Sequence, residues 1–181
     1  MPELEDLRNR SLVWQIDVLH KGRCAIYDGA QEIGHVQQES WWRGRYDASL
    51  AGLSWKLQYA APPFRTALRI DFADGKRGLA ETFKTNRGLG ATVDGITPFR
   101  FERDDGPRGV WRDSDGFVAV SIGEQANEPL RSDWIRHGAI RAFEVCAVPH
   151  APTLILPGLV EVVFNGFFIH QSYVPVDFSQ G

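Results

Sequence analysis

Basic side chains gather in the middle of this chain, at a spacing that would let several of them contact one anionic group. Arg65 and Arg69 lie four residues apart in a run of alternating apolar residues, which places both on one face of a strand. The basic residues that follow, on the strand expected next, are Lys76, Arg77, Lys84 and Arg87. From Arg65 to Arg112 the chain has ten basic and seven acidic residues, a local excess of +3 within a formal net charge of −3.

Arginine can donate two parallel hydrogen bonds to a phosphate or carboxylate. This charged face therefore favours binding of phosphate groups or of anionic lipid head groups. The alternative is a solvated sheet face whose edge lysines prevent aggregation.

A second candidate is the aromatic stretch Ser40 to Tyr46, with the sequence SWWRGRY. Its aromatic rings and arginines are suited to stacking on a ligand at the mouth of a barrel. The same residue types also pack the core and rim of a barrel, so both interpretations stay open. We include Trp41, Trp42 and Arg43 among the candidate ligand-binding residues.

Patterns that indicate catalysis or metal binding are missing from the sequence. The histidines have no recognisable metal-binding spacing, and there is no C-x-x-C or G-x-S-x-G. Gly88-Leu89-Gly90 starts like a dinucleotide-binding fingerprint but lacks the third glycine. We expect no catalytic residues, no metal and no cofactor, and a role that is not enzymatic.

Short alternating runs joined by turns dominate the chain that must position these residues. Leu53 to Tyr59 and Phe64 to Phe72 each alternate apolar and polar residues, which is typical of half-buried strands. Asp-Gly occurs at residues 28, 74, 94, 105 and 115, and this dipeptide favours tight hairpin turns. With 18 glycines in 181 residues, the sequence predicts an antiparallel barrel of about twelve strands.

The stretch Thr153 to Tyr173 has apolar residues on all sides of a helix, so it must be buried in a core or in a membrane. Pro157, Gly158, Glu161 and Asn165 interrupt it, and the apolar run is shorter than the ~20 residues of a bilayer span. We predict a helix near residues 152–172, enclosed by the closed sheet. The domain would span 11–175, with a flexible arm at 1–10.

The first residues, MPELEDLRNR, have no apolar run and do not match a secretory signal. We therefore expect a cytoplasmic protein in which Cys24 and Cys146 are reduced thiols, although a disulfide between them stays an alternative. The modest net charge does not favour nucleic acid as a partner. Anionic lipid head groups or another protein are the expected partners, with the protein at the membrane periphery and not spanning it.

Three segments together resemble the tubby C-terminal-like superfamily, and within it the LURP-one-related and YxjI-like proteins. They are CAIYDGAQEIGHV at 24–36, FRTALRIDFADGKRGL at 64–79 and PTLILPGLVEVVFNGFF at 152–168. The resemblance implies a closed antiparallel barrel around a C-terminal helix and a lipid-associated or scaffold role. The eukaryotic tubby proteins bind phosphoinositide head groups through basic residues on the barrel surface, but no motif here assigns those residues individually.

The sequence thus predicts a binding or scaffold protein that contacts anionic groups on its outer surface. The runner-up is a calycin or lipocalin-like carrier of a small apolar ligand, because the stretch at 40–46 is similar to the Gly and Trp near the start of those barrels. A carrier needs an empty barrel interior, so the late helix would have to pack outside it.

Overall fold

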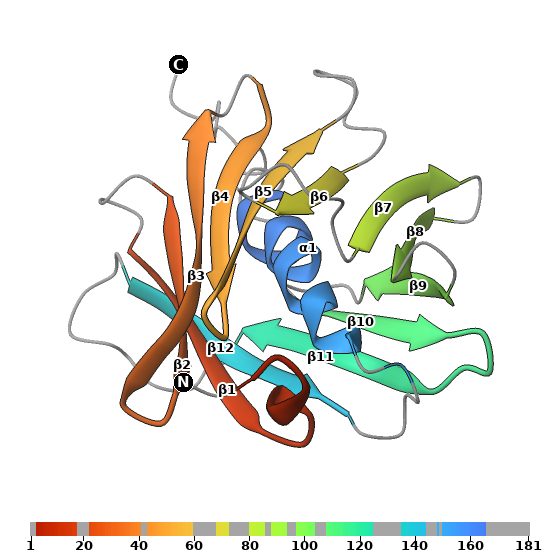
Figure 1. The fold of residues 1–181 in the computed structure, drawn as a ribbon, viewed down its shortest axis with the longest axis horizontal. Coiled ribbons are helices and arrows are strands. Elements are labelled where there is room, and N and C mark those ends of the chain that lie inside the picture. The colour runs from red at the N-terminus through yellow and green to blue at the C-terminus, as the bar shows by residue number, and fades with distance from the viewer. Residues whose placement is uncertain are drawn as a thin grey trace, which may run out of the picture.

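The structure of the chain, a computed structural model, describes residues 3–17, 22–40, 43–59, 68–72, 80–85, 88–93, 97–103, 108–124, 135–143, 148 and 150–165. Twelve strands and one late helical segment lie within these ranges (Figure 1). The strands are β1 Ser11–Asp17, β2 Arg23–Asp28, β3 Gln31–Ser40, β4 Arg45–Leu50, β5 Leu53–Tyr59, β6 Leu68–Phe72, β7 Ala80–Thr85, β8 Gly88–Val93, β9 Thr97–Arg103, β10 Arg108–Asp113, β11 Val118–Glu124 and β12 Ile135–Ala142.

The named strands pair in antiparallel fashion, each with its neighbour in the sequence, and β1 also pairs with β12. The order of pairing therefore returns to its starting strand. The seam between β6 and β7 is narrow, with two residue pairs, Arg69 with Glu81 and Ile70 with Ala80. There the buried hydroxyl of Thr82 accepts a hydrogen bond from the Leu68 N–H at 2.9 Å, which adds a bond between the two strands. The predicted antiparallel β fold with one late helix is confirmed.

Two of the predicted Asp-Gly turns are confirmed as hairpins. Asp28 pairs with Gln31 across the first turn, where Gly29 has a positive φ of 60°. In the turn between β10 and β11, Gly116 has a φ of 86° and the Asp113 carboxylate accepts the N–H groups of Asp115 and Phe117. Glycine suits both turns because it adopts positive φ without strain. The other three Asp-Gly pairs lie outside the described residues.

Alternating side chains on the strands separate an inward, apolar face from an outward, polar one. On β5 the buried residues are Trp55, Leu57 and Tyr59, and the exposed Lys56 and Gln58 lie between them. This period of two follows from the pleat of the strand. This alternation predicts the strand β5 from the sequence, whereas β4 was not among the predicted strands.

Residues 3–10, which the sequence predicted as a flexible arm, pack against the sheet. A short 3-10 turn at Glu5–Leu7 places Leu4 and Leu7 in the core, with exposed fractions of 5% and 0%. The Asn9 N–H donates to the Ala142 carbonyl at 2.7 Å, which ties the segment to the end of β12. Burial of two leucines provides the free energy that orders this segment.

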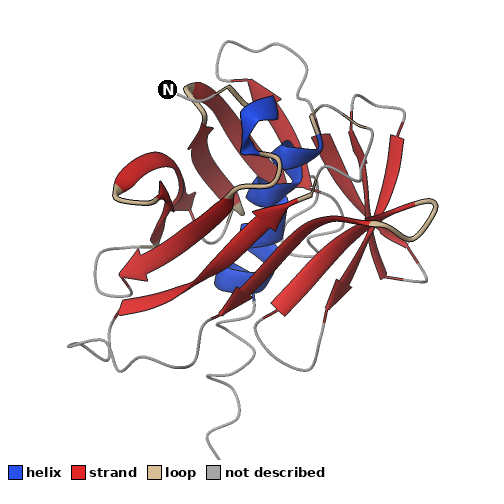
Figure 2. Cartoon of the chain, turned by 90° about the horizontal axis from the view of Figure 1, so that it is seen from below, coloured by secondary structure: helices blue, strands red, loops and turns tan. Residues whose placement is uncertain are grey.

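The late helical segment begins at Ala151, close to the predicted start. It runs through a 3-10 turn at Ala151–Leu154, helix α1 at Ile155–Leu159 and a π-helical turn at Val160–Asn165. From Ala151 to Phe164 every residue except Glu161 is buried. Figure 2 shows strands on several sides of it. The predicted continuation to residue 172 lies outside the described residues.

Gly158 allows the helix to approach the sheet closely. A Cβ placed there would lie 2.4 Å from Ile122 Cδ1 and 2.9 Å from the Trp111 indole nitrogen. Both distances are too short for ordinary packing, so a glycine is needed where α1 crosses β10 and β11. The helix therefore packs directly on the inward face of these strands.

Cys24 is a buried free thiol on β2, and desolvation by burial raises its pKa well above the ordinary range. A thiol that stays protonated is chemically inert. Cys146 lies outside the described residues. In the described part of the chain, no helix has the length and apolar content that a bilayer crossing requires.

Candidate functional site

The predicted ligand-binding residues divide between described and undescribed parts of the chain. Arg43 lies in the turn between β3 and β4, Arg69 lies on β6, and Lys84 lies on β7. The remaining candidates lie outside the described residues; they are Trp41, Trp42, Arg65, Lys76, Arg77 and Arg87. The site is therefore built from Arg43 and Arg69 and from the residues that the fold places beside them.

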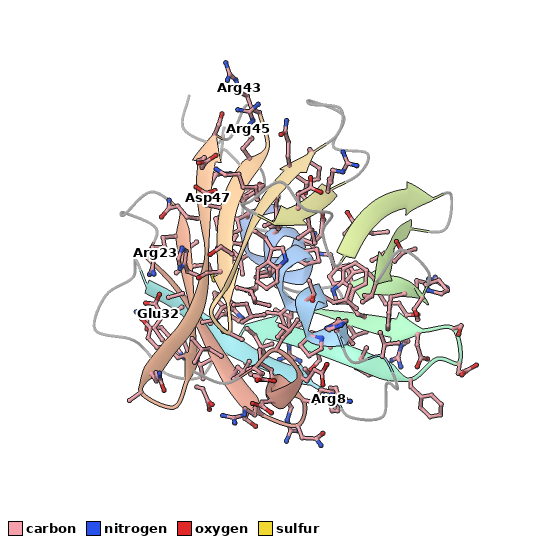
Figure 3. All side chains as sticks on the ribbon, in the orientation of Figure 1. Arg8, Arg23, Glu32, Arg43, Arg45 and Asp47 are labelled. Carbon is pink, nitrogen blue, oxygen red and sulfur yellow. The ribbon has the colours of Figure 1, made fainter. Side chains whose placement is uncertain are left out.

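Strand register brings the two sequence-distant candidate groups to one end of the sheet. The Gly44 carbonyl, next to Arg43, accepts a hydrogen bond from the Tyr59 N–H at 3.1 Å. Tyr59 in turn pairs with Leu68, the neighbour of Arg69. The turn that carries Arg43 and the start of β6 are thus separated by a single strand, β5. Figure 3 shows Arg43 and Arg45 at this end, away from the helix.

A row of polar residues crosses the outward face at this end. Arg45 pairs with Gln58, and Gln58 pairs with Arg69. Because neighbouring strands lie about 4.8 Å apart, the backbones of the two arginines are about 10 Å apart with a glutamine amide between them. We call Arg43, Arg45, Gln58 and Arg69 the rim. The sequence-based set lacked Arg45 and Gln58, since only the pairing of β4 with β5 shows that they adjoin Arg69.

Among the side chains that the structure describes, none fully neutralises either arginine of this row. Arg69 Nε lies 3.5 Å from an Asp71 carboxylate oxygen, but the arginine side chain is 66% exposed, so the ion pair is weak. Glu81 is the next residue of the row on β7. The Nε of Arg45 is buried and has no hydrogen-bond partner within the described part of the chain. An N–H group that is buried without an acceptor favours a ligand that supplies one.

A different set of charges lies on the outward face of β2 to β5, and there each charge has a partner. Arg23 forms an ion pair with Glu32, and Lys56 Nζ lies 3.0 Å from Asp47 and 3.7 Å from Glu39. We call Arg23, Glu32, His35, Glu39, Asp47 and Lys56 the paired-charge face. It has three acidic and two fixed basic side chains around one histidine, so its formal net charge is −1 with the histidine neutral.

The pKa shifts on this face follow from these contacts. The hydrogen bond with Asp47 raises the pKa of Glu39, with burial and the Asp47 charge acting in the same direction. Burial acts to raise the pKa of Asp47, but hydrogen bonds from Glu39 and Lys56 outweigh it and the pKa is lowered. The pKa of Glu39 therefore lies above that of Asp47.

His35 is the one histidine of the paired-charge face. Burial and the positive charge of Arg23 lower its pKa, against the opposing effect of Glu32 and Asp47. Its Nδ1 lies 2.9 Å from the Ser49 hydroxyl and 3.8 Å from a Glu32 oxygen. Because both groups approach the same ring nitrogen, this is not the relay of a catalytic triad, in which the hydroxyl and the carboxylate contact opposite nitrogens.

The π-helical end of the late segment contacts the inward face of β4 and β5, behind the rim. The Tyr59 hydroxyl donates a hydrogen bond to the Glu161 carboxylate at 3.0 Å. The rings of Tyr46 and Phe164 pack edge to face, with their centroids 5.3 Å apart. Glu161 is the one partly exposed residue between Ala151 and Phe164. A hydrogen bond and aromatic packing thus connect the helix end to Tyr59 and Tyr46, which lie beneath the rim.

Side chains that commonly bind metal ions do not cluster in the described part of the chain. Within these ranges, no three histidine, cysteine, aspartate or glutamate side chains gather in a way that could hold a metal ion. A comparison with known protein families, with curated proteins and with solved structures finds no match to this chain. The geometry of the chain itself is therefore the basis for inferring its function.

Proposed function

We propose that this protein is a cytoplasmic, non-enzymatic binding or scaffold protein that binds phosphate groups at the rim. The observation that carries the proposal is the cross-strand row in which Arg45, Gln58 and Arg69 are consecutive on the outward face. Arg43 lies at the same end of the sheet, in the turn that precedes β4. The row thus presents two guanidinium groups and one amide, all of them donors, on neighbouring strands.

The chemistry of these groups fits a phosphate better than a neutral ligand. Guanidinium groups donate paired hydrogen bonds to phosphate oxygens, and an amide N–H adds a further donor. Arg43, Gln58 and Arg69 are exposed. A phosphate in a lipid head group and a free phosphate offer the same oxygens, so both belong to the ligand class. Binding to lipid would place the protein at the membrane periphery.

The proposal includes a closed barrel of the tubby-like type, in which the narrow seam between β6 and β7 completes the wall around the helix. Its support is the cyclic strand order and the burial of residues 151–164. Those buried side chains occupy the inward side of the sheet, where the carrier hypothesis needs an empty cavity. This observation favours binding on the outside.

Sedimentation with lipid vesicles tests the proposal. The chain should sediment with vesicles of phosphatidylcholine plus phosphatidic acid and stay in solution with phosphatidylcholine alone. A surface arginine contributes about 1 kcal/mol to such binding, so the double variant Arg45→Gln/Arg69→Gln should weaken it about 30-fold. Arg8→Gln is the matched control, because Figure 3 shows Arg8 at the opposite end of the molecule from Arg43.

Competition with inorganic phosphate separates the two sources of the phosphate group. If free phosphate at physiological salt releases the chain from vesicles, the rim recognises the phosphate itself. If it does not, the lipid surface is required. Equal sedimentation with both vesicle types, or an equal loss in the Arg8 control, would overturn the proposal.

A further inference from the structure

Two arginines lie directly opposite each other on β9 and β10, on the outward face of the sheet. Arg100 pairs with Arg112, and the adjacent pair is Phe101 with Trp111. The rings of Phe101 and Trp111 pack together with centroids 4.8 Å apart, and both residues are buried. Alternation along the strands therefore places both arginines on the other, outward face. Directly opposed like charges repel, so an anion between the two guanidinium groups would stabilise this pair.

Arg112 is held in one orientation by its neighbours. Its Nε donates to a Glu102 carboxylate oxygen at 2.8 Å, and its Nη1 donates to the Gly116 carbonyl at 3.0 Å. The turn that presents this carbonyl is itself fixed by the hydrogen bonds to Asp113. The guanidinium plane is thus set in advance, while Nη2 has no acceptor within the described part of the chain. A donor that is already oriented loses less entropy when a ligand binds.

Arg100 has no compensating charge among the described residues. It is exposed and forms no ion pair there, and Glu102, the nearest acidic residue along β9, contacts Arg112. On its other side the register places Gly90 of β8, which has no side chain. The space beside Arg100 on that strand is therefore not filled by a neighbouring side chain at this position.

We propose that Arg100 and Arg112 form an oxyanion site for one phosphate group, with Glu102 as the positioning residue of Arg112. A tetrahedral phosphate would bridge the opposed guanidinium groups and remove their repulsion. The site shares no residue with the rim and does not depend on the function proposed for it. It would give the protein a second contact for phosphate on a different part of its surface.

Titration of the full chain with inorganic phosphate, followed by NMR of the arginine Nε–H signals, tests this site. The signals of Arg100 and Arg112 should shift together with one dissociation constant. A charged hydrogen bond contributes about 1.5–3 kcal/mol, so Arg100→Gln should weaken binding at Arg112 by about 10- to 100-fold. Arg103→Gln removes the same charge from an exposed position on the same strand and should change that constant less than about 3-fold.

The same titration distinguishes this site from the rim. In the Arg45→Gln/Arg69→Gln variant the shifts of Arg100 and Arg112 should persist, whether or not that variant still binds vesicles. Arg100→Gln should in turn leave the rim signals unchanged. The proposal would be overturned if Arg100→Gln and Arg103→Gln weakened phosphate binding equally, or if Arg100 and Arg112 gave separate dissociation constants. Either result would mean that phosphate is attracted to positive charge in general and not to one site.

Discussion

The inward and outward faces of the same strands differ in what packs against them. On β4 the inward residues Tyr46, Ala48 and Leu50 are buried, while Arg45 and Asp47 alternate with them on the outward face. The helical segment from Ala151 to Phe164 packs against the inward face. The outward face has solvent and its own charged neighbours. The binding function that we propose therefore lies on the outward face, whereas the packing of the inward face contributes to stability.

The outward face itself divides into two kinds of charge cluster. On the paired-charge face, Lys56 Nζ lies within 4 Å of carboxylate oxygens of both Asp47 and Glu39, so each of these charges has an opposite charge beside it. At Arg100 and Arg112 two like charges are opposed, with one carboxylate nearby. Charges that are already paired gain little from a ligand, whereas Arg100, which has no acidic partner among the described residues, gains more from an anion. Residue type alone does not separate these two cases; the cross-strand partner does.

A charge on the inward face should have the largest effect. Val163→Asp would place a carboxylate in the core at a residue that is 5% exposed. An uncompensated buried charge costs more than about 4 kcal/mol, a large part of the roughly 5–15 kcal/mol that stabilises a typical domain, so the variant should be severely destabilised. Val13→Asp makes the same change on the outward face of β1, where the valine is 38% exposed, and should cost about 1 kcal/mol or less.

Circular dichroism during thermal unfolding measures both variants. Equal melting temperatures for Val163→Asp and Val13→Asp would contradict the assignment of Val163 to the buried core and of Val13 to the outward face.

Glycines that allow close packing should give the next largest effect. A Cβ at Gly138 would lie 1.9 Å from the Gly123 carbonyl oxygen and 2.5 Å from the Trp14 indole nitrogen, which donates to that oxygen at 3.2 Å. Since a backbone atom cannot move away easily, Gly138→Ala should lower the free energy of unfolding by about 3 kcal/mol.

The matched control is Gly123→Ala, whose Cβ would meet only the flexible Arg108 side chain at 3.4 Å. That variant should lose less than about 1 kcal/mol, because the contact is an ordinary one. Chemical denaturation measures both values. If both variants lost the same free energy of unfolding, the close packing of Trp14 on Gly138 would not be the reason that this position requires glycine.

A smaller effect is expected where the helix end meets the strands. Tyr59→Phe removes the 3.0 Å hydrogen bond to Glu161 and should lower the free energy of unfolding by about 1 kcal/mol, since Glu161 is partly exposed and can bind water instead. Tyr27→Phe is the control, because Tyr27 forms no side-chain hydrogen bond within the described residues. A double-mutant cycle with Glu161→Ala, which removes the acceptor, should show coupling for Tyr59 and none for Tyr27.

Periodicity made much of the fold predictable from the sequence. The alternation in Leu53 to Tyr59 and the Asp28-Gly29 turn are local signals, and the structure has a strand and a hairpin at these places. The stretch after Thr153 is also a local signal, because its apolar residues on all sides of a helix predicted that the helix is buried. The role of Leu4 and Leu7 was missed, because two leucines in a polar segment give no periodic pattern and their burial depends on β12 beside them.

The candidate sites were less predictable, because they depend on pairings between strands. Arg45 was visible in the aromatic stretch, yet its position two strands from Arg69 follows from the register of β4, β5 and β6. Arg100 and Arg112 are twelve residues apart in the sequence and belong to the same local excess of basic residues. Only the β9–β10 register makes them direct neighbours. A sequence pattern gives the face of a strand but not the residue opposite.

The smallest predicted effect concerns His35 on the paired-charge face. Burial and the Arg23 charge lower its pKa below the ordinary value of 6.5, so the unfolded chain binds this proton at a higher pH than the folded chain does. Stability from this group is therefore complete above about pH 6.5 and is lost as the pH falls through that value. Chemical denaturation at several pH values should show this decline, and His35→Gln should reduce it.

NMR titration of the His35 ring gives a direct check, with the urea-unfolded chain as the reference. The midpoint should be lower in the folded protein than in the unfolded one. A midpoint at or above the unfolded value would mean that Glu32 and Asp47 outweigh Arg23 and burial. The paired-charge face would then carry excess negative potential at its histidine, and its contrast with the arginine pair of β9 and β10 would be larger than its formal charges indicate.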